Sequence, residues 1–452
     1  MGQSSQKPTA ASLGAGGALR GQIKIPGDKS ISHRVVMFGG MAKGETRVSG
    51  LLEGEDVMAT AAAMRAMGAL VERLGDGEWR ITGAGLLQEP AQVLDMGNSG
   101  TSCRLLMGIL AGQGFSSCMT GDASLVTRPM GRVTRPLEQM GASFISRDGG
   151  RLPLAIKGGG LAGIDYAPDV ASAQVKSAIL LAGLFAQGTT RVTELAPTRD
   201  HTERMLPLFG ASCQTEGLTI TLEGGQSLTA PDAGLTVPAD PSSAGFFMVA
   251  ASIVPGSEVE LPGVSLNPGR IGLIDSLLDM GADITISNHR SVGAEPVGDI
   301  TIRHARLHGA TIPADRAPSM IDEYPVLAMA AACATGVTRM EGVGELRVKE
   351  SDRLLLVAQG LDACGVPVRY DLTEGAEWLE VTGSAGAPVA GGARIETALD
   401  HRIAMSFLTL SLVASSPVTV DDAGPIATSF PTFQQCMEQL GATWHSPESA
   451  PA

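Results

Sequence analysis

Apolar and polar positions along the chain follow one pattern that occurs six times. In each copy a helix-like stretch ends at an apolar residue before a glycine, and these glycines are 69 to 84 residues apart. In the fourth copy Ile271, Ile274, Leu277 and Leu278 recur at helical spacing, and a strand-like run follows at 282–286. A glycine directly after such a stretch fits the left-handed position that ends many helices. The six glycines are Gly68, Gly141, Gly210, Gly281, Gly365 and Gly441.

Each copy also contains a second helix-like segment, which leads through turn residues into a short β run. These segments are apolar nearly all round, which predicts that they are buried. Alternating helices and strands predict an α/β architecture, and a boundary is expected near 236–240, with three copies on each side. The second segments include 177–185, 245–253, 324–333 and 403–413, and the β runs include 46–48, 189–192, 258–261, 338–340 and 418–420.

The composition narrows the class of protein. The 452 residues include 33 basic and 47 acidic ones, a net charge of −14, with no long basic run, which argues against nucleic-acid binding. No uninterrupted apolar run of ~18 residues occurs, so no membrane-spanning helix is expected. The six cysteines are scattered without a CxxC pair, which predicts free thiols in a reducing, cytoplasmic compartment. The first 20 residues are small and polar and are expected to form a disordered tail.

Polar residues differ between the copies at equivalent positions, the starts of the predicted helices. Helix N-termini attract phosphate and carboxylate groups through unpaired N–H groups and a partial positive charge. Different polar residues at these starts predict one shared anion cleft, in which Asp322 and Glu350 are the carboxylates that move protons. The cations of this predicted site are Lys29, Arg34, Arg128, Lys349, Arg353 and Arg402.

Each motif also has a simpler structural interpretation when it is taken alone. Side chains at helix starts can serve only as caps, charged residues can form a solvated helix face, and His401 can be a core histidine. The segment 27–30 lacks the glycine spacing of a nucleotide P-loop. The functional interpretation is favoured because all of these motifs lie at the starts of predicted secondary-structure elements. The positions with a purely structural alternative include 97–101, Ser172, Ser242, Ser243, Asp322, Glu323 and 349–353.

Eight motifs at such positions carry a family resemblance. They lie at 26–34, 97–104, 121–130, 172–176, 199–203, 321–325, 347–353 and 400–405. Through them the chain resembles the EPSP synthases, or 3-phosphoshikimate 1-carboxyvinyltransferases (EC 2.5.1.19), over residues 20–445. Several motifs are similar to the bacterial class II branch of that family.

The resemblance implies a two-domain, inside-out α/β barrel-like fold. It would be built from six βαβαββ-type units, three in each domain, with the substrate cleft between the domains. One domain would comprise 1–24 with 240–452, and the other 25–239. The resemblance also implies a monomeric cytoplasmic enzyme that requires no metal or organic cofactor and binds neither nucleic acid nor a membrane.

The implied reaction transfers the enolpyruvyl group of phosphoenolpyruvate to the 5-hydroxyl of shikimate 3-phosphate and releases phosphate through a tetrahedral intermediate. Asp322 would accept the hydroxyl proton with Lys349 nearby, Glu350 would handle the proton at C3, and Lys29 would contact both substrates. The implied contacts of shikimate 3-phosphate are Lys29, Ser30, Arg34, Ser172, Ala173, Gln174, Arg199, Asp322 and Lys349, and those of phosphoenolpyruvate are Lys29, Asn98, Gly100, Arg128, Gln174, Arg353 and Arg402.

Two positions distinguish the chain within the resemblance. Thr428 stands where many members of the family have a lysine, so no role is assigned to it. Gly100 stands where some herbicide-tolerant members have alanine. Because glyphosate occupies the phosphoenolpyruvate site in this family, we expect it to inhibit the protein.

Two other functions compete with this interpretation. UDP-N-acetylglucosamine enolpyruvyl transferases share the architecture and the donor, but have Lys-Asn where this chain has Lys29–Ser30 and a loop cysteine near the position of Arg128. A non-catalytic, anion-binding repeat protein would have no need for both Asp322 and Glu350 among its cations.

Overall fold

The computed structural model describes residues 9–446, which divide into two compact units. Unit 1 comprises 9–26, Ala239–Arg290 and 296–446, and unit 2 comprises Gly27–Pro238 and Ser291–Glu295. Each unit has a hydrophobic core of its own. Unit 2 is therefore nearly continuous in sequence, whereas unit 1 is assembled from three segments.

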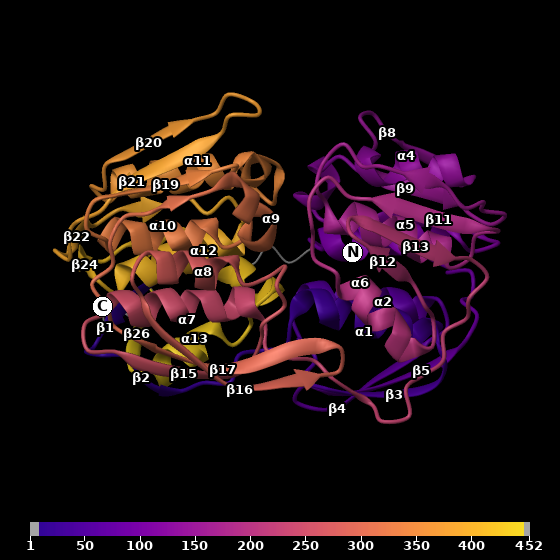
Figure 1. Ribbon diagram of the computed structural model, residues 1–452, viewed down its shortest axis with the longest axis horizontal. Coiled ribbons are helices and arrows are strands. Elements are labelled where there is room, and N and C mark those ends of the chain that lie inside the picture. The colour runs from indigo at the N-terminus through magenta and orange to yellow at the C-terminus, as the bar shows by residue number, and fades with distance from the viewer. Residues whose placement is uncertain (1–8, 447–452) are drawn as a thin grey trace. The chain divides into compact units, whose positions relative to one another are not determined.

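Unit 2 contains three α/β copies, each with a four-stranded sheet of the same topology (Figure 1). In each sheet the first strand is a short edge strand that pairs in parallel with the second. The third strand pairs in antiparallel fashion with the second, and the fourth with the third. The strand orders are β14-β3-β5-β4, β6-β7-β9-β8 and β10-β11-β13-β12. The elements are α1 (Lys29–Met41), β3 (Lys43–Ser49), α2 (Glu55–Ala66), β4 (Leu70–Gly75), β5 (Glu78–Ala84), β6 (Leu94–Asp95), α3 (Gly100–Ala111), β7 (Ser116–Thr120), α4 (Gly131–Met140), β8 (Ser143–Arg147), β9 (Arg151–Lys157), β10 (Asp165–Tyr166), α5 (Ala173–Gly183), β11 (Thr189–Thr193), α6 (His201–Met205), β12 (Gln214–Glu216), β13 (Thr219–Glu223) and β14 (Leu235–Thr236).

Unit 1 repeats this topology in the sheets β2-β15-β17-β16 and β18-β19-β21-β20, but its last copy forms the strand pairs β22–β24, β23–β25 and β1–β26. Its elements are β1 (Ser12–Ala15), β2 (Arg20–Gln22), α7 (Pro241–Ile253), β15 (Glu258–Ser265), α8 (Gly272–Asp279), β16 (Asp283–Val292), β17 (Glu295–Arg303), β18 (Thr311–Ile312), α9 (Ala317–Met320), α10 (Tyr324–Cys333), β19 (Val337–Glu341), α11 (Arg353–Ala363), β20 (Val368–Asp371), β21 (Trp378–Thr382), β22 (Val389–Gly391), β23 (Arg394–Ile395), α12 (His401–Ser411), β24 (Ala414–Ser416), β25 (Thr419–Val420), α13 (Phe433–Gln439) and β26 (Ala442–His445). The α/β architecture expected from the sequence is confirmed in both units.

The predicted second helices form the buried centre of each unit. All 13 residues of α7 and all 11 residues of α12 are buried, as expected for segments that are apolar nearly all round. In unit 2 the helices α3 and α5 pack so closely that a Cβ atom on Gly108 would lie 2.1 Å from the carbonyl oxygen of Ala178. The small side chains of these helices therefore allow the backbones to approach.

The six repeated glycines have the conformation predicted for helix ends. Their φ angles lie between +79° and +115°, which a side chain disfavours, and a strand of each copy (β4, β8, β12, β16, β20 or β26) begins shortly after each of them. The glycines therefore mark the turn from the outer helix of each copy to its next strand.

Capping side chains begin five of the six buried helices. In each case a carboxylate or hydroxyl oxygen accepts a hydrogen bond from a backbone N–H group of the first turn. The capping interpretation is therefore correct for Ser172, whereas Ser242 and Ser243 lie inside α7, which Asp240 caps. The five capping residues are Asp28, Ser99, Ser172, Asp240 and Asp400.

The prediction of a disordered tail over the first 20 residues is wrong from residue 9 onward, and residues 1–8 lie outside the described part of the chain. Ser12–Ala15 forms β1, which pairs in antiparallel fashion with β26, and β2 extends the sheet of β15. Leu13 is 1% exposed and Leu19 is 0% exposed. The burial of these two leucines in the core of unit 1 stabilises the folded segment, although its small and polar composition did not predict such burial.

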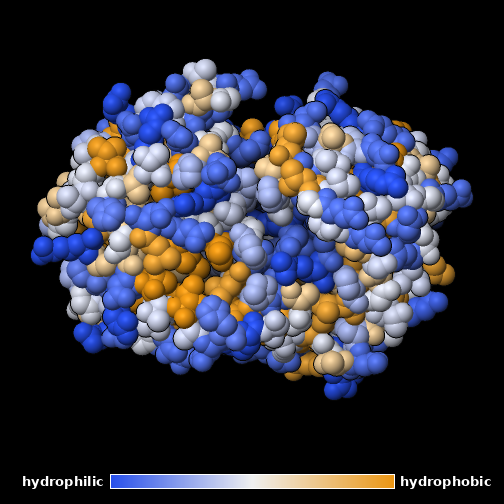
Figure 2. Space-filling view, in the orientation of Figure 1, coloured by the Kyte–Doolittle hydropathy of each residue, from blue (hydrophilic) through white to orange (hydrophobic). Residues whose placement is uncertain are grey.

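Hydrophilic residues cover much of the face shown in Figure 2, with hydrophobic residues between them. Within 9–446, no helix is long and apolar enough to cross a membrane.

Candidate active site

Arg353 is the centre of a buried charge cluster in unit 1. It is the first residue of α11, it is 1% exposed, and it contacts three carboxylates. Its Nε atom lies 2.7 Å from Oδ2 of Asp400, its Nη1 atom 3.1 Å from Oδ1 of Asp322, and its Nη2 atom 2.5 Å from Oε2 of Glu350. The two carboxylates predicted to move protons are therefore held by one guanidinium.

Charge compensation keeps Arg353 ionised. Burial by itself lowers the pKa of Arg353, but the charges of Asp400, Glu350 and Asp322 outweigh burial and raise that pKa above its usual value. Lys349 adds a second cation, with Nζ 3.4 Å from Oδ1 of Asp322. The cluster thus combines fixed positive charge with carboxylates that can exchange protons.

Arg402 joins this cluster from the first turn of α12. Its Nη1 atom donates to the carbonyl oxygen of Asp322 at 3.1 Å and lies 3.3 Å from Oε1 of the buried Glu323. Asp400 caps the same helix through the N–H group of Arg402, at 2.9 Å, while it also binds Arg353. Asp400 therefore contacts two of the three arginines predicted to hold phosphoenolpyruvate, and the third, Arg128, belongs to unit 2.

In unit 2 the start of α1 carries Lys29, Ser30 and Arg34. Lys29 forms an ion pair with Asp56, with Nζ and Oδ2 3.0 Å apart. Arg34 is 3% exposed and donates to Thr202 Oγ1 at 2.8 Å, to the Ser30 carbonyl at 2.9 Å and to Ser177 Oγ at 2.7 Å. Its side chain therefore links α1 to α5 and α6.

The pKa of Arg34 reflects this enclosure. Burial lowers the pKa of Arg34 to about 10, although the negative charges of Glu203 and Asp28 act to raise it, and the positive charge of Arg199 acts in the same direction as burial. Arg199, one of the predicted contacts of shikimate 3-phosphate, thus lies within electrostatic range of Arg34. Both belong to unit 2.

The starts of α3 and α5 are connected through Gln174. Its Oε1 atom accepts from Nη1 of Arg104 at 2.7 Å, and its Nε2 atom donates to Oγ1 of Thr101 at 3.0 Å. A Cβ atom added to Gly100 would lie 3.2 Å from Nη1 of Arg104 and 3.2 Å from Nη1 of Arg128. Gly100 therefore leaves room beside two guanidinium groups.

Asn98 fixes the orientation of Arg128. Its Oδ1 atom accepts from Nη2 of Arg128 at 2.8 Å, and its Nδ2 atom donates to Oδ2 of Asp122 at 2.7 Å. A further hydrogen bond of 3.1 Å joins Arg128 to Oγ of Ser124. Arg128 is thus held at the loop that precedes α3, close to Gly100.

The structure groups the predicted site residues within each unit. Asp322, Lys349, Glu350, Arg353 and Arg402 lie together in unit 1. In unit 2, side-chain contacts connect the start of α3 with the start of α5, and α1 with α5. The predicted residues of unit 2 are Lys29, Ser30, Arg34, Asn98, Gly100, Arg128, Ser172, Ala173, Gln174 and Arg199.

Arg104 lies within one of the motifs but is not among the predicted site residues, although it binds Gln174 directly. It lies one helical turn after Gly100 in α3, and this i, i+4 spacing is the signal that could have identified it. His401 is 4% exposed, with Nδ1 3.5 Å from Oγ1 of Thr428, so a buried histidine faces the position at which the family lysine is replaced.

Asp200, His201 and Glu295 in unit 2 bring potential metal-ligand atoms within 4.8 Å of one another. Asp200 pairs with Nε of Arg204 at 2.7 Å, and Nδ1 of His201 lies 2.8 Å from Oε1 of Glu295. A metal ion would have to compete with these partners, so the group is explained by the ion pair of Asp200 with Arg204 and by the hydrogen bond between His201 and Glu295.

Comparison with known proteins first identifies the class. The fold is that of the enolpyruvyl transferases: NikO from Streptomyces tendae, a member of that class, has a TM-score of 0.78 over 98% of this chain and 100% of its own, at 19% identity. That likeness shows the fold alone. EPSP synthase from Acinetobacter baumannii has a TM-score of 0.86 and 47% identity, over 97% of this chain and 100% of its own.

The sequence matches the EPSP synthase (3-phosphoshikimate 1-carboxyvinyltransferase) family over residues 13–437. The 3-phosphoshikimate 1-carboxyvinyltransferase of Caulobacter vibrioides is 56% identical over 436 residues, which cover 95% of this chain and 97% of that protein. The Parvibaculum lavamentivorans protein of the same name is 55% identical over 435 residues, 95% of each chain. The chain therefore belongs to the EPSP synthase family.

Proposed function

We propose that the protein transfers the enolpyruvyl group of phosphoenolpyruvate to the 5-hydroxyl of shikimate 3-phosphate and releases phosphate. The observation that carries this proposal is the cluster in which Arg353 holds Asp322 and Glu350 beside Lys349. A proton acceptor, a second proton carrier and fixed cations are what the transfer between two anions requires. Membership of the family supports the same activity.

Each bond change in this reaction has a candidate group in unit 1. Asp322 accepts the proton of the attacking 5-hydroxyl, whose oxygen bonds to C2 of phosphoenolpyruvate, while C3 gains a proton from Glu350. The resulting tetrahedral intermediate loses phosphate, which takes up the proton that Asp322 had accepted, and Glu350 takes a proton back from C3. Arg353 and Arg402 bind the phosphate and carboxylate of phosphoenolpyruvate, since guanidinium groups match both shapes.

The residues of unit 2 bind the two substrates in this proposal. Lys29 contacts both substrates, as does Gln174, whose orientation Arg104 supports. Asn98, Gly100 and Arg128 contact phosphoenolpyruvate. The contacts proposed for shikimate 3-phosphate alone in this unit are Ser30, Arg34, Ser172, Ala173 and Arg199.

The domain organisation is part of the same proposal. One domain comprises 1–24 with 240–452 and the other 25–239. The two compact units support this division, except that 291–295 pack with unit 2 rather than with the segments on either side of them. The proposed enzyme uses no resident metal or organic cofactor, and a monomeric state and a cytoplasmic location stay predictions.

Glyphosate is proposed as an inhibitor that occupies the phosphoenolpyruvate position beside Gly100. The absence of a Cβ atom there supports the proposal, because the guanidinium groups of Arg104 and Arg128 lie next to the space. Activity that is unchanged in millimolar glyphosate would contradict it.

Phosphate release from purified protein tests the proposed reaction. With phosphoenolpyruvate and shikimate 3-phosphate together, we expect continuous release, and with either substrate alone we expect none. Absence of release, or release only when a UDP-sugar replaces shikimate 3-phosphate, would show that the proposal is wrong.

The substitution Asp322→Ala tests the role of the proposed base. We expect phosphate release to fall at least about 100-fold, as for loss of a general base, while the circular dichroism spectrum stays that of the parent protein. Asp362→Ala, which removes an exposed carboxylate of α11, is the matched control and should retain full activity. Near-normal turnover of the Asp322 variant would remove this residue from its proposed role.

A further inference from the structure

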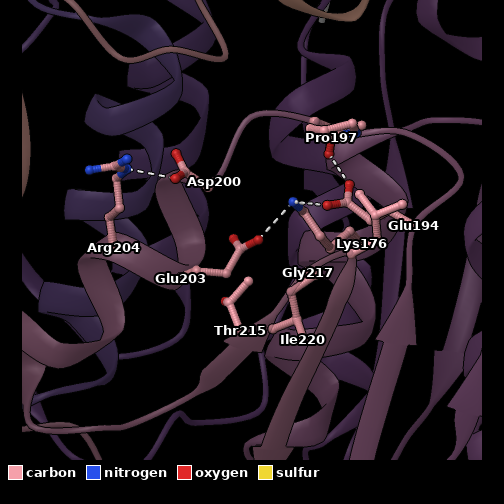
Figure 3. Close-up of a pocket in the computed structure, with 11 residues that line it drawn as sticks. Lys176, Glu194, Pro197, Asp200, Glu203, Arg204, Thr215, Gly217 and Ile220 are labelled. Atoms are coloured by element: carbon pink, nitrogen blue, oxygen red, sulfur yellow. Dashed lines mark hydrogen bonds and ion pairs between the residues drawn. The ribbon is translucent and has the colours of Figure 1, made fainter.

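Glu323 of unit 1 is a buried carboxylate that has no part in the proposed reaction. It is 2% exposed and pairs with Arg402, a proposed contact of phosphoenolpyruvate. In the pocket of unit 2 shown in Figure 3, the buried Lys176 lies between Glu194 and Glu203, and none of these three residues is a proposed substrate contact. Glu323, in contrast, is paired directly with the proposed site.

Both polar contacts of the Glu323 side chain use the same carboxylate oxygen. Oε1 lies 3.3 Å from Nη1 of Arg402, and it accepts a hydrogen bond from the hydroxyl group of Ser242. Oε2 is buried, and no hydrogen-bond partner for it is present within 9–446. The position of Oε1 is therefore set by one donor from α7 and one donor from α12.

A second buried arginine holds the hydroxyl group of Ser242. Arg270 is 4% exposed, and its Nη2 atom donates to Oγ of Ser242 at 2.7 Å and to Oδ1 of Asp240 at 2.9 Å. Because the hydroxyl oxygen accepts from Arg270, its single proton is directed to Glu323. A chain of hydrogen bonds thus runs from Arg270 through Ser242 and Glu323 to Arg402.

Arg402 is the end of this chain that contacts the substrate in the proposed reaction. Within the part of the chain that the structure describes, its side chain contacts Glu323 and the carbonyl oxygen of Asp322, and both contacts use Nη1. This leaves Nε and Nη2 for an anion. Two donors of one guanidinium bind a carboxylate or a phosphate in a fixed plane, so their direction depends on where Nη1 is held.

We propose that Glu323 is a positioning residue for phosphoenolpyruvate: the place of its Oε1 atom sets the direction in which Arg402 presents Nε and Nη2. The inference rests on the proposed function, in which Arg402 binds this substrate. A negative charge near the site by itself opposes the binding of an anion. The benefit of Glu323 therefore comes from geometry and not from charge.

The substitutions Glu323→Asp and Glu323→Gln separate position from charge. The aspartate keeps the charge but withdraws the carboxylate by one carbon–carbon bond, about 1.5 Å, whereas the glutamine keeps an oxygen in the place of Oε1 and removes the charge. In steady-state kinetics we expect KM for phosphoenolpyruvate to rise about tenfold or more in Glu323→Asp and less than about threefold in Glu323→Gln. KM for shikimate 3-phosphate should stay within about twofold of the parent value in both.

Three outcomes would overturn the proposal. These are an equal or larger rise in Glu323→Gln, no rise in Glu323→Asp, and an equal rise of both KM values. The first would show that the charge matters more than the position, and the last would show a general structural effect.

Ser242→Ala covers the case in which neither variant of Glu323 folds, because it leaves the pair of Glu323 with Arg402 in place. It removes one of the two donors to Oε1, so we expect KM for phosphoenolpyruvate to rise at least about threefold. Ser252→Ala is the matched control and should keep the parent value, because it removes a buried hydroxyl of the same helix that donates to the carbonyl oxygen of Met248. Identical KM values for the two variants would contradict the chain of contacts.

A crystal structure of Glu323→Asp tests the placement without turnover. We expect the guanidinium group of Arg402 to move away from the carbonyl oxygen of Asp322, from which it lies 3.1 Å in the parent protein. If the parent protein released no phosphate from its two substrates, the proposed function would be wrong, but a displaced Arg402 would still show that Glu323 holds it. An Arg402 that keeps its place in the variant would contradict the inference whatever the activity.

Discussion

At the scale of single residues, Arg353 shows how one side chain can organise a charged site. Its guanidinium contacts Asp322, Glu350 and Asp400 from a position that is 1% exposed. The planar fork contacts the three carboxylates through three different nitrogens, which holds them farther apart than the single nitrogen of a lysine could. The geometry of the proposed proton carriers therefore depends on the shape of this residue as well as on its charge.

Arg353→Lys tests this dependence because it retains the charge and removes the fork. We expect kcat/KM for phosphoenolpyruvate to fall about 100-fold, since displacement of catalytic groups by about 1 Å has effects of that size. Steady-state kinetics provide the measurement. Arg369→Lys, an exposed residue of the same unit, is the control and should retain the parent value. If kcat/KM of Arg353→Lys were close to that of the parent protein, the positive charge alone would be sufficient for activity.

Gly100→Ala tests the space beside Arg104 and Arg128. The new Cβ atom would lie 3.2 Å from a guanidinium nitrogen of each, so both side chains have to move by a few tenths of an ångström. We expect the glyphosate concentration for half-inhibition to rise at least about tenfold, a difference of 1.4 kcal/mol, with a smaller rise in KM for phosphoenolpyruvate. An inhibition curve that coincides with that of the parent protein would show that glyphosate does not bind beside Gly100.

At the scale of elements, the close approach of α3 and α5 depends on a helical glycine. Gly108 lies in the middle of α3, where glycine lowers helix stability by about 1 kcal/mol relative to alanine. The contact with the backbone of Ala178 explains why a poorer helix former is present. The same two helices bear Gly100 and Gln174 at their first turns, so their packing also fixes the relative positions of these site residues.

Gly108→Ala should therefore destabilise the protein although it improves helix propensity. We expect a loss of about 1–3 kcal/mol from overpacking, seen as a lower melting temperature by circular dichroism. Gly114→Ala is a matched control, because no atom lies within 4 Å of its added Cβ. An unchanged or higher melting temperature for the Gly108 variant would show that α3 and α5 can move apart at little cost.

Local features of these elements were predictable from the sequence, and long-range side-chain contacts were not. The glycine and cap positions follow from neighbouring residues, as at Gly141 and Ser172. The hydrogen bonds of Arg34 join it to residues 143 and 168 positions away, and Gln174 lies 70 positions from Arg104. The periodicity of hydrophobic residues does not indicate such long-range contacts, so the burial of Arg34 is visible only in the folded structure.

At the scale of the whole molecule, burial separates the six free cysteines into reactive and unreactive thiols. Burial raises the pKa of Cys103 and of Cys333 to about 12, and the pKa of Cys213 and of Cys364 to about 11. Cys118 is exposed on β7. Since the thiolate is the nucleophile, we expect the exposed Cys118 to be the most reactive of the six, with the other five thiols partly or fully buried.

At pH 8 an aromatic disulfide reagent should react rapidly with Cys118 and slowly with the buried cysteines. Raising the pH should accelerate the slow reaction up to pH 11 or 12, because a thiol gains thiolate until the pH passes its pKa, and burial has raised the pKa of these thiols to about 11 or 12. Absorbance of the released thiolate measures both rates. Cys118→Ser should remove the rapid phase, and its persistence in that variant would show that another cysteine is accessible.

The discontinuity of unit 1 has a consequence for the time at which each part of the chain can fold. Residues 27–238 leave the ribosome as one continuous stretch, so most of unit 2 can form early in synthesis. β1 must wait for β26, the last strand described, before it has a partner. Until then Leu13 has no strand beside it, so β1 stays an unpaired apolar edge while residues 16–441 are synthesised.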